Sequence, residues 1–173
     1  MKTQSQVLHY PSLTEALVLG SSGSSTQRTI RYGLLALAGS VLIAICAQIS
    51  VPLFPVPMTL QTFAVFLIGL TYGWRLGAVT IALYLAEGAF GLPVFAGGKG
   101  GLIEFISPTA GFKFGFLLAA TACGWFAERG FDRSYTKLFA ALLVGNILLY
   151  APGLLWLGSL IGWDKPVLEY GLY

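Results

Sequence analysis

The sequence has little charge. Only 10% of its 173 residues are Asp, Glu, Lys or Arg, whereas average soluble chains carry roughly 25%. No charged side chain occurs between Arg31 and Arg75. A second gap runs from Lys137 to Asp164. A helix in water turns every face to solvent within a few residues and needs charge there, whereas a helix in hydrocarbon must do without it. The sequence therefore predicts an integral membrane protein.

Cysteine and histidine are also scarce. Cys46 and Cys123 lie in apolar runs, and the single histidine, His9, lies near the polar start of the chain. This set is too small for a zinc site, and the thiols are expected to pack as small apolar side chains. Motifs for nucleotide binding, nucleophilic catalysis and nucleic-acid binding are missing too. We therefore expect no enzyme activity, cofactor, metal or nucleic-acid partner, and active transport would need a partner or an ion gradient.

The chain divides into two parts. Residues 1–29 are polar and rich in Ser and Thr, which is typical of a disordered cytoplasmic tail. Residues 30–173 are predicted to form an all-α bundle embedded in the membrane. Five apolar runs predict spans at about 32–49, 59–72, 76–90, 112–126 and 138–160. The second and third are short for a hydrocarbon layer of roughly 30 Å, so they are expected to tilt or to flank a cavity.

The basic residues predict the orientation of these spans in the cytoplasmic membrane. With the N-terminus in the cytoplasm, seven of the ten Lys and Arg residues face inward and three face outward. The inward residues are Lys2, Arg28, Arg31, Arg75, Arg129, Arg133 and Lys137, and the outward ones are Lys99, Lys113 and Lys165. Because cytoplasmic loops carry an excess of Lys and Arg, we expect a multi-pass protein in this orientation.

Small residues repeat every four positions on the first span, at Ala36, Ser40 and Ala44. This spacing places all three on one helix face. In lipid, a face of small side chains lets another helix approach closely and gain dispersion contacts. The stripe therefore predicts either packing within this bundle or docking of a partner membrane subunit.

Two segments have polar groups suited to a ligand. Thr59 stands where a helix N-cap is expected and Gln61 lies in the first turn, so carboxylates or carbonyls can meet free amides there. The alternative is that Thr59 only caps the helix and Gln61 faces lipid headgroups. The loop 91–111 is long and places four glycines around Lys99, which favours a lid with exposed amides. The alternative is a flexible outer loop.

Other polar residues lie inside the apolar spans. Glu87 near the outer end of the third span is either a functional acid or a hydrated residue at the interface. Asn146 and Tyr150 lie one helical turn apart, and Asn146 either bonds a neighbouring helix or offers a donor and an acceptor to a cyclic urea or amide. Tyr84 is a similar candidate. Pro152 is expected to kink the fifth span and to help open a pocket.

Three blocks of the sequence together resemble the BioY family. They are 56–65 (VPMTLQTFAV), 91–98 (GLPVFAGG) and 107–111 (SPTAG), and they occur in the family's order with plausible spacing. The resemblance extends over about 32–173, and three separate blocks make it specific. Members of this family are the biotin-specific substrate-binding (S) subunits of energy-coupling-factor (ECF) vitamin transporters.

The resemblance implies a bundle of six membrane helices that holds biotin near the outer face, beneath loops. The implied partners are a membrane-spanning coupling subunit and two ATPase subunits, whose ATP hydrolysis drives uptake. A homo-oligomer without dedicated partners is an alternative. The coupling subunit is expected to dock on small residues of the first helix, which here are Ala36, Ser40 and Ala44.

The resemblance also implies a ligand site. Biotin has a ureido ring that donates and accepts hydrogen bonds, an apolar thioether ring and an anionic tail, and its buried polar groups need partners. Gln61, Tyr84 and Asn146 are expected to address polar groups and Phe95 to pack on the apolar part. Backbone amides in the loop, with Lys99, are expected to close the site. The full set of expected ligand-binding residues is Thr59, Gln61, Tyr84, Phe95, Gly97, Gly98, Lys99, Asn146 and Tyr150.

In the family the chain continues into a sixth helix with a Gly-Asp pair and a downstream lysine, and both charges belong to the ligand site. The present sequence reaches Tyr173 where that helix is expected to begin. The expected fold is therefore the family's six-helix bundle with five spans clear and the sixth cut off at the C-terminus.

Two other functions fit the same residues. A stand-alone carrier coupled to ions or protons would use Glu87 as its proton site and would need no ATPase. A non-transporting membrane scaffold would use the stripe and Asn146 only to bind helices. Proton-dependent uptake that is lost in Glu87→Gln favours the carrier, and a folded protein that binds no small molecule favours the scaffold.

Overall fold

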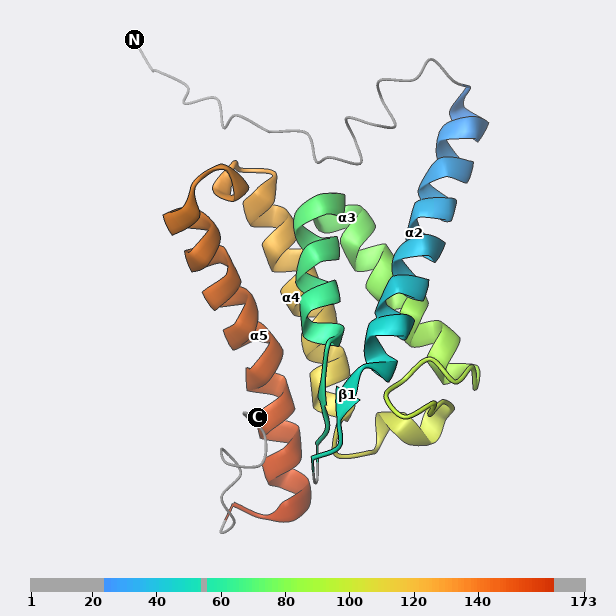
Figure 1. The fold of residues 1–173 in the computed structure, drawn as a ribbon, viewed down its shortest axis with the longest axis vertical. Coiled ribbons are helices and arrows are strands. Elements are labelled where there is room, and N and C mark those ends of the chain that lie inside the picture. The colour runs from blue at the N-terminus through green and yellow to red at the C-terminus, as the bar shows by residue number, and fades with distance from the viewer. Residues whose placement is uncertain (1–23, 54–55, 164–173) are drawn as a thin grey trace.

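The structure is a computed structural model that describes residues 24–53 and 56–163 (Figure 1). Most of the predicted N-terminal tail and the end of the chain, where a sixth helix is expected, lie outside the described residues. Four described helices are long and apolar enough to cross a membrane. They are α2 (Ser25–Gln48), α3 (Gln61–Ala89), α4 (Ala110–Ala127) and α5 (Tyr135–Ile161). The prediction of a helical membrane bundle is confirmed.

Helix α2 begins before the predicted first span because its N-terminus is capped. Ser24 Oγ accepts a hydrogen bond from the backbone amide of Gln27 at 3.4 Å, and Gln27 Oε1 accepts one from the amide of Ser24 at 3.3 Å. This capping box satisfies two donors that a helix start otherwise leaves open. The helix therefore includes residues from Ser25 onward that the sequence assigns to the tail.

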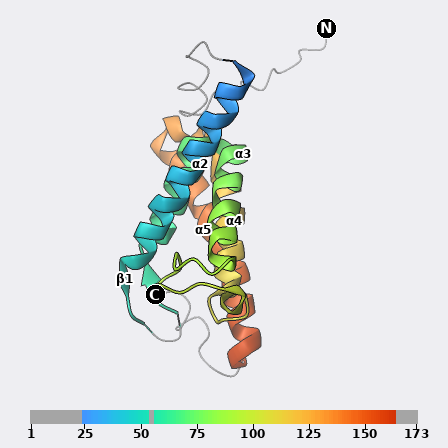
Figure 2. The ribbon, with the colours of Figure 1, turned by 90° about the vertical axis from the view of Figure 1, so that its right-hand side faces the viewer.

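After α2 the chain reverses through a small two-stranded sheet. Strand β1 (Ser50–Val51) pairs antiparallel with β2 (Met58–Thr59). Proline lacks an amide donor, so Pro52 and Pro57 in the connection prevent the helix from continuing. The sheet is an addition to the purely α-helical prediction, and it returns the chain to the start of α3 at the same end of the bundle (Figure 2).

Helix α3 consists of two arms joined at Gly73. This residue has φ 77° and ψ 175°, a conformation that glycine adopts without the steric cost that a Cβ brings. The chain turns back at this bend (Figure 1), and the arms touch where a Cβ on Gly77 would lie 3.5 Å from Gly69 Cα. The two arms correspond to the short spans predicted at 59–72 and 76–90, so helices occupy all five predicted spans.

The arms of α3 lie at the centre of the bundle, between α2 and α4, and α5 packs on the other side of α4 (Figures 1 and 2). Small residues allow this close approach. A Cβ on Gly69 would meet the backbone of Ala120, and one on Gly115 would meet the backbone of Leu149. The short 3-10 helices η1 (Leu102–Phe105) and η2 (Phe131–Arg133) connect the long helices.

The outward faces of α2 and α5 are apolar and exposed, as expected for surfaces in lipid. On α2 they include Leu34, Leu37, Val41 and Ile45, and on α5 they include Phe139, Leu143, Ile147 and Leu155. Buried side chains face the interior instead, and Ile43 and Leu149 are almost fully enclosed. The burial pattern thus separates a lipid face from a packed face on each outer helix.

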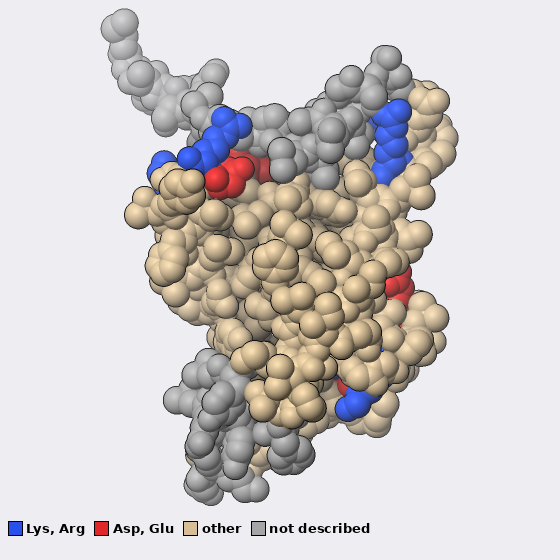
Figure 3. All heavy atoms as spheres, in the orientation of Figure 1, with Lys and Arg blue, Asp and Glu red and all other residues tan. Residues whose placement is uncertain are grey.

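Charge collects at the ends of the bundle. Figure 3 shows Lys and Arg at the upper end and an almost uncharged band across the middle. The upper end holds the start of α2, the bend of α3 and the connection between α4 and α5, with Arg28, Arg31, Arg75, Arg129, Arg133 and Lys137. Lys99, in the connection between α3 and α4, and Lys113, in the first turn of α4, lie at the opposite end. For the described residues, this division matches the predicted grouping.

Candidate functional site

A cavity of about 440 Å³ opens at the end of the bundle opposite the basic cluster. Its wall comes from β2 and the start of α3, the connection between α3 and α4, the first turns of α4, and α5. The side chains with polar atoms that line it are Thr59, Gln61, Thr62, Lys99, Glu104, Ser107, Thr109, Lys113 and Tyr150. The structure therefore gathers polar residues from distant parts of the chain around one hollow.

Five of the predicted ligand-binding residues line this cavity: Thr59, Gln61, Phe95, Lys99 and Tyr150. Thr59 Oγ1 accepts a hydrogen bond from the amide of Gln61 at 3.3 Å and donates one to Gln61 Oε1 at 3.1 Å. The side chain of Gln61 is thereby fixed at the start of α3. Tyr150 packs its ring edge-on against Phe112, with ring centroids 5.9 Å apart.

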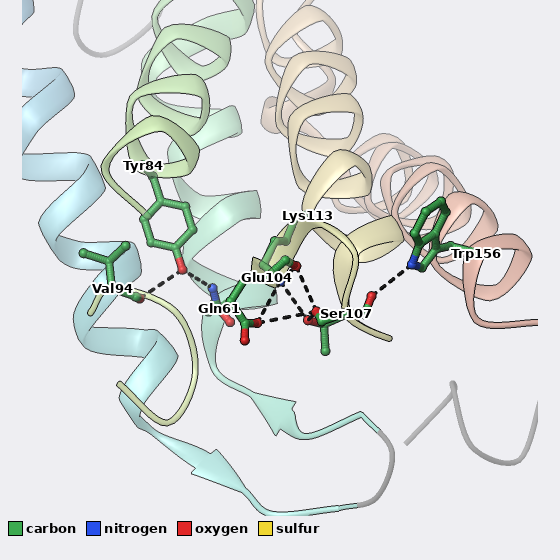
Figure 4. A network of polar contacts seen from close by, with 8 residues as sticks. Gln61, Tyr84, Val94, Glu104, Ser107, Lys113 and Trp156 are labelled. Atoms are coloured by element: carbon green, nitrogen blue, oxygen red, sulfur yellow. Dashed lines mark hydrogen bonds and ion pairs between the residues drawn. The ribbon is translucent and has the colours of Figure 1, made fainter. Parts of the chain in front are cut away.

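Tyr84 lies behind the wall of the cavity, although the sequence predicts it as a ligand contact. Gln61 Nε2 donates to Tyr84 Oη at 2.7 Å, and Tyr84 Oη donates to the backbone oxygen of Val94 at 3.1 Å (Figure 4). The Tyr84 side chain is fully buried. Its position therefore holds Gln61 and the loop after α3 in place.

The glycine loop is tied to the end of α2 by Gln48. Gln48 Nε2 donates to the backbone oxygen of Phe95 at 3.1 Å, and Gln48 Oε1 accepts from the amide of Gly98 at 3.0 Å. Gly97 and Gly98 have φ of 72° and 69°, and both lie exposed at the tip of the loop. They do not line the cavity, and the amide of Gly98 is already engaged, so this structure does not bring the two predicted glycines to a ligand.

Phe95 forms a buried wall of the cavity. Its ring packs edge-on against Tyr84 and Phe105, with centroid distances of 5.5 and 5.9 Å. It fits there because residue 88 is glycine, since a Cβ on Gly88 would lie 2.5 Å from Phe95 Cε1. The prediction that Phe95 packs on a ligand stays a prediction, and its place in the wall is compatible with it.

Lys113, the most enclosed charged group of the cavity, is absent from the predicted ligand-binding set. It lies in the first turn of α4 with a side chain 6% exposed, whereas the sequence assigns it only to the outward-facing charges. Lys113 Nζ donates to the backbone oxygen of Glu104 at 2.9 Å and to Thr109 Oγ1 at 2.8 Å. The sequence contains a signal for it, because Lys113 is the single charged residue of α4 and lies two residues after the SPTAG block.

Ser107 joins this cluster to α5. Its Oγ donates to the backbone oxygen of Glu104 at 2.8 Å, and its backbone oxygen accepts from Trp156 Nε1 at 2.9 Å (Figure 4). Ser107 thus fixes the end of the connection between α3 and α4 to η1 on one side and to α5 on the other.

Asn146 does not reach the cavity, although the sequence predicts it as a ligand contact. Its Nδ2 donates to the backbone oxygen of Leu142 at 2.9 Å, one turn earlier on the same helix. The cavity is lined by Leu149 and Tyr150, which lie nearer the end of α5. The side-chain amide of Asn146 therefore has a hydrogen-bond acceptor within its own helix.

The small-residue stripe of α2 faces α3. Ala36 and Ser40 are 4% and 0% exposed, and Ala44 is half-buried. Ser40 Oγ donates to Glu87 Oε1 at 3.0 Å, which joins α2 to the second arm of α3. This placement agrees with packing within the bundle, and docking of a coupling subunit on the stripe stays a prediction. Glu87 lies in an open groove between α2 and α3, apart from the cavity.

Comparison with known proteins supports the resemblance noted in the sequence. The BioY family profile matches residues 19–172. The "Biotin transporter BioY" of Thermotoga maritima is 43% identical over 114 residues, which cover 66% of this chain and 66% of that protein. The "Biotin transporter BioY" of Rhodobacter capsulatus is 44% identical over 131 residues, covering 72% and 68%. A crystal structure of the S-component for biotin from an ECF-type ABC transporter matches with a TM-score of 0.71 at 25% identity, covering 87% of this chain and 82% of that one. The chain belongs to the BioY family.

Proposed function

We propose that this chain takes up biotin across the cytoplasmic membrane as the S subunit of an ECF-type transporter. The observation that carries the proposal is a cavity of about 440 Å³ in a chain whose relatives are named biotin transporters. Cavities for small molecules measure roughly 300–1,000 Å³. The similarity to the S-component for biotin supports the same assignment.

The charge distribution supports a cavity that opens outward. Six described basic residues share the end that holds the bend of α3, and positive charge marks the cytoplasmic side of membrane proteins. The N-terminus and this end are therefore cytoplasmic in our proposal. The cavity then faces outside, where a capture subunit meets its substrate.

The proposed ligand contacts are the cavity-lining members of the predicted set: Thr59, Gln61, Phe95, Lys99 and Tyr150. The aromatic rings supply apolar surface for the thioether ring, and Gln61 and Thr59 supply hydrogen-bonding groups. Lys99 is exposed at the rim of the cavity, where it attracts an anionic tail.

Energy for uptake comes from partner proteins in this proposal, since the sequence carries no nucleotide-binding motif. The partners are a coupling membrane subunit and two ATPases, and the chain itself catalyses no covalent step. Ala36 and Ser40 are buried, whereas Ala44 lines an open groove on α2, so Ala44 and the surface around it are the part of the predicted stripe that a coupling subunit can contact. Uptake by a homo-oligomer without these partners is the alternative arrangement.

The first test is binding of radiolabelled biotin to the purified protein in detergent. We expect saturable binding that unlabelled biotin displaces, and binding about 10-fold weaker in Tyr150→Ala, because the variant loses an aromatic wall of the cavity. Phe139→Ala is the matched control, since Phe139 is an aromatic residue of α5 that is exposed on the outer face. A folded protein without saturable binding contradicts the proposal.

The second test separates an ECF subunit from a stand-alone carrier. Biotin uptake is measured in cells with and without the coupling subunit and ATPases. We expect uptake that depends on these partners and persists in Glu87→Gln, because Glu87 lies outside the cavity. Uptake without partners that disappears in Glu87→Gln supports the proton-coupled carrier.

A further inference from the structure

The cavity contains an ion pair that the sequence-based site does not use. Glu104 from η1 and Lys113 from α4 both line the cavity, with Glu104 Oε2 3.5 Å from Lys113 Nζ. The side chains of Glu104 and Lys113 are 13% and 6% exposed. Burying two charges costs free energy that their mutual attraction offsets only in part. Such a pair at the wall of a hollow is therefore suited to a ligand that adds hydrogen bonds to it.

The ammonium of Lys113 makes two short hydrogen bonds and one long one. Two short bonds, to the backbone oxygen of Glu104 at 2.9 Å and to Thr109 Oγ1 at 2.8 Å, fix its position (Figure 4). The Phe95 ring covers one side, with its centroid 4.8 Å from Nζ. The contact with Glu104 Oε2 is at the outer limit of a hydrogen bond. The N–H that makes this long contact is the weakest held of the three, and a ligand oxygen at shorter distance can replace Glu104 Oε2 as its acceptor.

The carboxylate of Glu104 also has capacity left. Its Oε2 meets Ser107 Oγ at 3.4 Å and Lys113 Nζ at 3.5 Å. Within residues 24–53 and 56–163, no hydrogen bond is found to Oε1. A carboxylate accepts on both oxygens, so Glu104 can take a hydrogen bond from a ligand N–H. The cavity therefore presents an acceptor and a donor next to each other.

Glu104 and Lys113 together have no net charge, and this favours an uncharged ligand group beside them. An anion that approaches Lys113 is repelled by the neighbouring carboxylate of Glu104. A cation that approaches Glu104 is repelled by the ammonium of Lys113. A neutral group with an N–H beside a C=O gains from both charges, because hydrogen bonds to charged groups are the stronger ones. The ureido ring of biotin is such a group, and its anionic tail fits the exposed Lys99 at the rim better.

We infer that Glu104 and Lys113 bind the ureido ring of the substrate: Glu104 accepts its N–H and Lys113 donates to its C=O. This assignment rests on the proposed function, since it assumes that biotin binds in this cavity and names the residues that bind its ring. It also makes the ring the inner end of the ligand and the carboxylate tail the outer end.

The experiment measures binding of biotin and of biotinamide, in which the tail carboxylate is neutralised, to the full chain in detergent. For Glu104→Gln and Lys113→Met we expect about 10-fold or greater loss of affinity for both ligands. For Lys99→Gln, the control, we expect loss for biotin and little change for biotinamide. A loss in Lys113→Met that vanishes with biotinamide means that Lys113 holds the tail, and it overturns the inference.

A measurement on the unaltered protein covers the case in which these variants do not fold. Biotin labelled with ¹³C at the ureido carbonyl is examined by infrared spectroscopy. We expect its stretching frequency to fall on binding, because a hydrogen bond from a partly enclosed ammonium polarises the carbonyl more than water does. An unchanged or higher frequency overturns the inference. Unaltered affinity in folded Glu104→Gln and Lys113→Met overturns the inference alone. Failure of the unaltered protein to bind biotin overturns the proposed function as well.

Discussion

The two ends of the bundle each enclose a carboxylate, and their surroundings differ. At the basic end, Glu128 is 6% exposed, and its Oε1 accepts from the backbone amide of Trp74 at 3.1 Å. That amide begins the second arm of α3 directly after the bend at Gly73. At the other end, Glu104 faces Lys113 across the wall of a cavity. One carboxylate stabilises a turn of the backbone, and the other is placed where a ligand can reach it.

The packing around the two acids differs in the same way. At the bend, a Cβ on Gly124 of α4 would lie 2.7 Å from Trp74 Cα. The backbone of α4 is therefore in direct contact with the backbone of the bend in α3. At the cavity end, loops and side chains enclose about 440 Å³. Changes at the bend are therefore expected to act on stability and changes at the cavity on binding.

The largest expected effect is on stability, in Gly124→Ala. The new methyl group overlaps the backbone of Gly73 and Trp74, which cannot rotate away as a side chain does. We expect the free energy of unfolding to fall by about 3 kcal/mol, measured by denaturation in detergent, with biotin affinity of the folded fraction nearly unchanged.

Gly33→Ala is the matched control for this change. Gly33 lies on α2, and a Cβ there meets nothing within 4 Å. Alanine is favoured over glycine inside a helix by roughly 0.5–1 kcal/mol, so stability should hold or rise. Equal stability of the two variants would show that the bend end is not tightly packed.

A smaller loss of stability is expected in Glu128→Ala. The amide of Trp74 loses its acceptor at a partly buried bend, and an unsatisfied donor there costs about 1 kcal/mol, the low end of the range for buried donors. Thermal melting in detergent measures the effect. Glu128→Gln keeps an acceptor oxygen, so it should lose less. If Glu128→Ala weakens biotin binding more than it weakens folding, the separation between the two ends is wrong.

The sequence predicted the parts of the fold that depend on local polarity and periodicity. The apolar runs located the spans, and the short runs on either side of Arg75 correspond to the two arms of α3. Periodicity also placed Ala36 and Ser40 on one face. It could not tell which neighbour that face meets, because Ser40 finds Glu87 through the folding of the whole chain.

The candidate site was predicted in part for the same reason. Gln61 and Phe95 lie in recognisable blocks and do line the cavity. Lys113 looks like an ordinary charge at the end of a span until η1 folds back and brings Glu104 to it. Asn146 shows the opposite case, since its polarity is evident in the sequence but its donor is satisfied within its own helix.

Gln48→Ala is expected to change overall stability least. Its main effect is expected to be local, at the loop beside the cavity. The variant removes the two hydrogen bonds that join α2 to Phe95 and Gly98, and neutral hydrogen bonds contribute about 0.5–1.5 kcal/mol each. The amide of Gly98 keeps its other acceptor, the backbone oxygen of Phe95 at 3.1 Å, so we expect the loss as local opening of the exposed loop. That amide should exchange with solvent about 5-fold faster, and biotin should dissociate faster.

Gln48→Glu tests the two hydrogen bonds of Gln48 separately, because it keeps the one from Gly98 and removes the one to Phe95. A carboxylate still accepts from the amide of Gly98 but cannot donate to the backbone oxygen of Phe95. Hydrogen exchange at Gly98 should then stay slow while biotin still dissociates faster, because Phe95 in the cavity wall has lost its tie to α2. If both variants release biotin at the rate of the unaltered protein, the loop does not limit release, and its tie to α2 has no part in binding.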